Sequence, residues 1–96
     1  MKVDETSFEK SHTAGVPSHL RDGLLRYVND HLRVGGFLTA VLENNLSEAM
    51  ARGDEESLAG LYAIACWVYN ETPSACWGSP EKVKAWLEAA SDDDRE

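Results

Sequence analysis

Apolar side chains recur at steps of three and four residues through most of this chain, which is the spacing of amphipathic helices. The first such segment covers residues 17–33, with Pro17 at a position that suits a helix start and Gly35-Gly36 after its end. No segment alternates apolar and polar residues over more than a few positions, as a strand would. The pattern therefore predicts an all-α fold, a compact bundle of four to five short helices.

The next segment, residues 37–52, keeps the helical spacing but is interrupted by Asn44-Asn45, which are good N-cap residues. It predicts either one bent helix or two short helices that meet near Asn45. Asp54 then offers a strong helix cap, and the residues that follow are apolar on nearly every side of a helix. We expect residues 54–70 to form one helix at the centre of the bundle.

A loop is predicted for residues 71–78, after which Ser79-Pro80-Glu81 is a clear helix start. The ends of the chain lack a sustained apolar period. We expect residues 1–15 to be a flexible arm and residues 91–96 to be an acidic, disordered tail. Residues 16–90 then form a single helical domain, the organisation typical of a chain of 96 residues.

Charge narrows the possible partners, because the chain carries a formal net charge of −8. Residues 34–80 hold Arg52 as their only cation among the carboxylates. Such a surface repels phosphate and anionic lipid, so we expect neither direct nucleic-acid binding nor membrane binding. A basic protein surface is the partner that this field attracts. The polar, acidic N-terminus and the lack of a long apolar run predict a cytoplasmic protein.

Catalytic, cofactor and metal sites are not predicted. His12, His19 and His31 lack the spacing of metal ligands, and no glycine-rich phosphate loop is present. Cys66 lies in the most apolar stretch, so its thiol should be buried and inert, whereas Cys76 in the loop should be the more exposed of the two. We therefore expect a binding protein that is not an enzyme and that needs no cofactor.

Two features are candidates for partner binding. One is an acidic pole at the start of the predicted central helix, formed by Asp54, Glu55 and Glu56 with Glu48 nearby in the chain. Capping and solubility also explain these carboxylates. The other is Trp77, which is flanked by small residues and glycine. It is either an exposed anchor for a partner or a side chain that packs back on the core.

Four short strings carry a resemblance that covers residues 16–86: Arg26-Tyr27-Val28, the segment Gly36–Leu42, the segment Tyr69–Ser74 and the segment Cys76–Val83. They resemble a group of small proteins encoded by tailed bacteriophages and prophages. The resemblance implies a phage-derived origin and brings no catalytic residue with it.

Two functions fit these observations. The first is an inhibitor of a host protein, in the manner of an anti-CRISPR or other counter-defence protein, that occupies a basic surface, such as that of a nucleic-acid-guided defence complex in the host bacterial cell. The alternative is a module of a phage structural or replication assembly that acts through oligomerisation. Short helices that depend on packing with neighbours favour that alternative.

Overall fold

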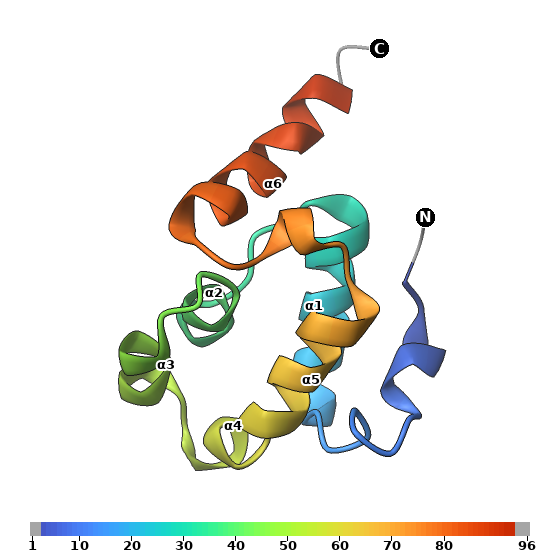
Figure 1. The fold of residues 1–96 in the computed structure, drawn as a ribbon, viewed down its shortest axis with the longest axis vertical. Coiled ribbons are helices and arrows are strands. Elements are labelled where there is room, and N and C mark those ends of the chain that lie inside the picture. Colours follow the sequence, from blue (N-terminus) through green and yellow to red (C-terminus); the bar gives the residue numbers. More distant parts are fainter. Residues whose placement is uncertain (1–2, 94–96) are drawn as a thin grey trace.

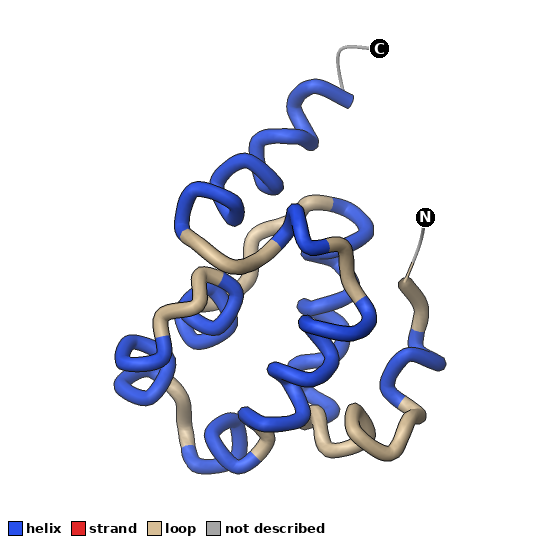
Figure 2. Tube along the Cα trace, viewed as in Figure 1, coloured by secondary structure: helices blue, strands red, loops and turns tan. Residues whose placement is uncertain are grey.

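The computed structural model describes the backbone of residues 3–93 and the side chains of residues 3–89. Within that range the chain forms helices and turns without a strand, which confirms the all-α prediction (Figures 1 and 2). The elements are the 3-10 turns η1 (Glu5–Phe8) and η2 (Ser74–Cys76) and the helices α1 (Ser18–Asp30), α2 (Gly36–Leu42), α3 (Leu46–Arg52), α4 (Glu55–Ala59), α5 (Leu61–Glu71) and α6 (Pro80–Asp93).

The segment with the asparagine pair forms two short helices, α2 and α3, which pack against each other. Asn44 takes up a left-handed conformation with φ 62°, and this turns the chain between the helices. The side chain of Asn45 then accepts a hydrogen bond of 3.2 Å from the backbone N–H of Glu48. The second of the two alternatives is therefore confirmed, with Asn45 as the cap of α3.

The prediction of one continuous helix over residues 54–70 is wrong, because the chain turns at Gly60 between α4 and α5. A Cβ atom at Gly60 would lie 2.4 Å from Cδ of Pro17, which is closer than real Cβ contacts. Only a glycine lets the start of α1 approach the chain so closely here. Asp54 does cap α4, since its carboxylate accepts a 2.8 Å hydrogen bond from the N–H of Ser57.

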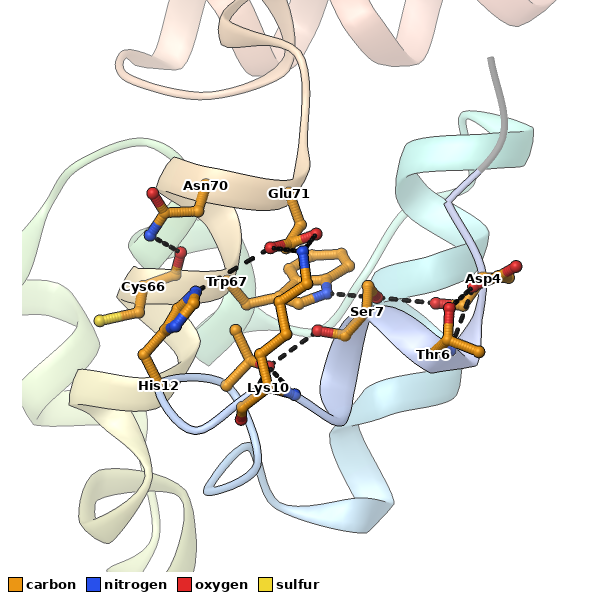
Figure 3. A network of polar contacts seen from close by, with 10 residues as sticks. Asp4, Thr6, Ser7, Lys10, His12, Cys66, Trp67, Asn70 and Glu71 are labelled. Atoms are coloured by element: carbon orange, nitrogen blue, oxygen red, sulfur yellow. Dashed lines mark hydrogen bonds and ion pairs between the residues drawn. The ribbon is translucent and has the colours of Figure 1, made fainter.

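The segment 3–15, which we expected to be a flexible arm, packs partly against the core: Val3, Ser7, Phe8 and Thr13 are buried. The ring of Phe8 is buried and stacks on Trp67 with the ring centroids 5.0 Å apart. The indole N–H of Trp67 donates a 2.8 Å hydrogen bond to the hydroxyl of Ser7. Figure 3 shows this bond, together with Lys10 reaching across to Glu71 on α5. One aromatic anchor and a few long-range hydrogen bonds hold the segment, so it needs no periodic apolar pattern.

The last helix, α6, continues to Asp93 and so includes three residues of the expected tail. The remaining positions of that tail, 94–96, lie outside the described residues. Helix α6 is joined to the body by Trp86, whose indole N–H donates a 2.8 Å hydrogen bond to the carbonyl oxygen of Tyr27. From there it projects away from the other helices (Figure 1).

The hydrophobic core joins the N-terminal segment, α1, α2 and α5. Its largest fully buried side chains are Trp67, Tyr27, Phe8, Leu24, Leu42 and Ile64. Among the described residues, no helix has the length and apolar character to cross a membrane.

Candidate functional site

Helix α5 has one buried face and one exposed face, and neither carries a charge before Glu71 at its end. Tyr62 and Tyr69 lie on the exposed face and leave 79% and 72% of their surface open to solvent. The exposed face of a surface helix normally carries charged residues. The expectation that residues 54–70 lie at the centre of the bundle therefore holds for only one side of α5.

A shallow hollow of about 310 Å³ lies on this exposed face. It is lined by Tyr62, Ala65, Cys66, Tyr69, Asn70 and Trp77. A smaller hollow of about 130 Å³ shares Ala65 with it and extends towards α3, where it is lined by Val41, Asn44, Asn45, Leu46, Ala49 and Leu61. No residue in either lining is charged. We call this surface the tyrosine face and define it as Leu46, Tyr62, Ala65, Cys66, Tyr69 and Trp77.

Trp77 lies half-buried at the edge of the tyrosine face. Its ring meets that of Tyr69 edge to face, with the centroids 5.7 Å apart and the planes at 62°. Its indole nitrogen is buried, and no acceptor among the described residues bonds to it. Trp77 therefore packs partly on the protein and also forms one wall of the hollow. Its role as an anchor for a partner stays a prediction.

Three of the four carboxylates of the acidic pole, those of Glu48, Asp54 and Glu56, contact other groups of the protein. Glu48 accepts a 2.6 Å hydrogen bond from Arg52, and Glu56 lies 3.5 Å from the ring of His19. The hydrogen bonds from Ser57 lower the pKa of Asp54 below its ordinary range. Glu55 is exposed. Trp77 does not join this pole, because the hollow that it lines contains none of these four carboxylates.

The two cysteines have the reverse of the expected environments. Cys76 is fully buried in η2, and its burial raises the pKa of the thiol. Cys66 is partly exposed on the tyrosine face. The prediction for Cys66 failed because no neighbouring element covers the side of α5 that carries it. Cys76 lies close to Tyr27, whose hydroxyl donates a 2.7 Å hydrogen bond to the carbonyl oxygen of Cys76.

The histidines lie apart from one another and contact separate parts of the fold. The Nδ1 atom of His31 is 2.7 Å from the carbonyl oxygen of Trp86. The ring of His12 is 3.9 Å from Glu71, whose carboxylate also binds Lys10 at 2.8 Å (Figure 3). In the described part of the chain, no three potential ligands gather closely enough to hold a metal ion.

Comparisons with models of protein families, with curated proteins and with solved structures find no match to this chain. The resemblance to small phage proteins therefore stays a prediction.

The sequence analysis did not predict the tyrosine face as a binding surface. Of its residues, only Trp77 was among the predicted binding residues. A signal for this face was present in the sequence. Residues 62, 65, 66 and 69 follow the spacing of one helical stripe, and none of them is charged.

Proposed function

We propose that this protein acts by binding another protein, and that the tyrosine face is its contact surface. The observation that carries the proposal is the exposure of Tyr62 and Tyr69 around an uncharged hollow. Tyrosine and tryptophan supply much of the binding energy at protein interfaces because they bury large rigid surfaces at a small cost in entropy. The role needs neither a catalytic group nor a cofactor, and its site of action is the cytoplasm of a bacterial host.

Site-specific photo-crosslinking in bacterial cells tests this proposal. A benzophenone amino acid in place of Tyr62 should give a discrete protein adduct on irradiation. The same amino acid in place of Asp22, which is exposed on α1, is the matched control and should give none. Adding Ala65→Glu to the chain should abolish the adduct, because it places a charge in the middle of the face. No adduct from position 62, or an equal one from position 22, would overturn the proposal.

A second candidate is the inhibitor that occupies a basic host surface through the acidic pole. Its support is the charge of residues 34–80, where Arg52 is the only cation, and the exposure of Glu55 and Glu56. Carboxylates at such a pole can steer a basic surface over a Debye length of about 8 Å. The partner on this hypothesis is a host complex with a basic channel, such as a nucleic-acid-guided defence effector.

Glutamine variants separate the effect of the acidic pole on binding from the effect of the net charge. The double variant Glu55→Gln, Glu56→Gln keeps the Asp54 cap and should cost well under about 1 kcal/mol of stability. Its control is Glu81→Gln, Glu88→Gln, which removes the same charge from exposed positions on α6. Co-elution with purified effector complexes at about 0.15 M salt should be lost in the first variant alone. Equal binding by both variants would eliminate the acidic pole as the site.

A further inference from the structure

The exposed side of α5 carries a stripe in which two small side chains lie between two large ones, in the order Tyr62, Ala65, Cys66 and Tyr69. These positions are three, four and seven residues from the first, so they lie along one side of the helix. The midpoint between positions 62 and 69 falls between Ala65 and Cys66. The order of large and small side chains is therefore the same from either end of the stripe.

A surface of this kind matches a second copy of itself turned through a two-fold axis. With the axis at Ala65 and Cys66, two α5 helices run antiparallel, and Tyr62 of each copy meets Tyr69 of the other. The small side chains at the centre let the helix axes approach towards the lower end of the usual range of about 8–10 Å. The tyrosine rings then fill the space on either side of the axis.

Charge also favours a second copy as the occupant. A basic partner would be matched by carboxylates, but neither hollow of the tyrosine face is lined by one. Glu71, at the end of α5, is only 13% exposed and is bound to Lys10. The chain carries a net charge of −8, and its charged residues lie outside the linings of this face. Two copies can therefore meet here without placing like charges against each other.

The exposed apolar area is large enough for a dimer. Besides the tyrosines, Leu46 is 65% exposed, and Met50 lies one turn further along α3 with 53% exposed. If an aromatic side chain offers about 200 Å², the two tyrosines present about 300 Å² per copy, and Leu46 and Met50 bring the exposed area to the order of 500 Å². Two copies that covered all of this surface would bury about 1,000 Å², which is the lower limit for a specific interface.

We propose that the protein forms an antiparallel two-fold dimer through the tyrosine faces, with Ala65 and Cys66 of both copies at the axis. This inference rests on the proposed function and names its partner as a second copy of the chain.

Sedimentation equilibrium of the purified protein over a range of concentrations tests the dimer. The mass should rise towards twice that of one chain. Ala65→Glu should raise the dissociation constant at least tenfold, because it brings two carboxylates together at the axis. Ala85→Glu makes the same change at an exposed position on α6 and should leave the constant unchanged. Circular dichroism of both variants checks that each is folded.

Salt distinguishes this dimer from an association driven by opposite charges. Screening reduces the repulsion between two acidic chains, so raising the salt concentration should strengthen the dimer. A dimer that weakens with salt would overturn the proposed interface.

Cys66 gives an independent readout, because its thiol lies beside the axis. A short bis-maleimide should link two wild-type chains and two Cys76→Ser chains, but it should fail with Cys66→Ser. Equal linking in the Cys66→Ser variant would place the contact elsewhere and overturn the inference.

The two proposals fail in different ways. A chain that stays monomeric at every concentration overturns the dimer. If position 62 nevertheless crosslinks to a protein of another mass in cells, the tyrosine face still binds a protein, and the proposed function stands. A monomer that also gives no adduct from position 62 overturns both. A dimer that Ala65→Glu does not weaken uses another surface and overturns the inference.

Discussion

The indole nitrogen of Trp67 lies 2.8 Å from the hydroxyl oxygen of Ser7, and the bond between them joins residues 60 positions apart. Ser7 also bonds within the N-terminal segment, because its own hydroxyl donates a 2.7 Å hydrogen bond to the carbonyl oxygen of Asp4. The buried tryptophan thus has its polar atom satisfied by the N-terminal segment, and that segment is part of the folded structure.

Ser7→Ala should therefore lower the free energy of unfolding by about 1–3 kcal/mol, since it leaves a buried N–H without an acceptor. Urea unfolding followed by circular dichroism measures the change. Ser47→Ala, at an exposed position on α3, is the control and should stay within about 0.5 kcal/mol of the wild type. Equal stability of the two variants would mean that the N-terminal segment does not support the core.

Two glycine-to-alanine variants should have opposite effects on stability. Gly60→Ala should destabilise the protein by about 1–3 kcal/mol, because its Cβ would collide with the ring of Pro17. Gly23→Ala, inside α1, has its nearest contact at an ordinary 3.9 Å and should stabilise the helix by about 0.5–1 kcal/mol. Thermal unfolding of both variants measures this. A Gly60→Ala variant as stable as the wild type would contradict the close approach of α1 and α4.

Alkaline pH should destabilise the fold. Burial raises the pKa of Tyr27 above its ordinary 10.0 and that of Cys76 above its ordinary 9.0. As the pH rises, the unfolded chain loses these protons before the folded chain does. The stability that the two groups contribute is thus complete below about pH 9 and falls as the pH rises through their folded pKa values.

Tyr27→Phe isolates the tyrosine part of this dependence. It should cost about 1 kcal/mol at neutral pH, because the carbonyl oxygen of Cys76 loses its donor. It should also lose less stability than the wild type between pH 7 and about pH 11, with the remainder due to Cys76. Urea unfolding at both pH values gives the comparison. A Tyr27→Phe variant that keeps the wild-type dependence would refute the assignment.

The two thiols should react at very different rates with a colorimetric disulfide reagent. Cys66 is partly exposed and should react rapidly in the folded protein. Cys76 is fully buried and should react only when the fold opens, at a rate at least about 100-fold lower than that of Cys66. Cys66→Ser should remove the fast phase and Cys76→Ser the slow one. The opposite result would restore the environments expected from the sequence.

The helices that depend on local signals could be predicted from the sequence. Asn45 marks the boundary between α2 and α3, and Ser79 marks the start of α6, where its hydroxyl accepts a 3.2 Å hydrogen bond from Lys82. Both caps act within three residues. The turn at Gly60 was missed because Gly60 packs against Pro17, which lies far away in the sequence.

The candidate site was predicted less well, because it depends on what covers each side of a helix. An apolar stretch such as residues 61–69 shows that a helix is partly buried, but it does not show which side remains open. Tyr62 and Tyr69 are exposed because neighbouring elements cover only the opposite side of α5. The acidic pole was visible in the sequence, but the pairing of Glu56 with His19 required the fold.

The attachment of α6 has a consequence for how the protein opens. Among the described side chains of α6, the large apolar ones that pack on the core, Val83, Trp86 and Leu87, lie in the first eight residues of the helix. A helix held at one end can detach as a unit while the remaining core stays intact. Amide hydrogen exchange would then report two free energies, a smaller one for the release of α6 and a larger one for the opening of α5 around Trp67. We therefore expect the C-terminal helix to be the first cooperative unit to detach.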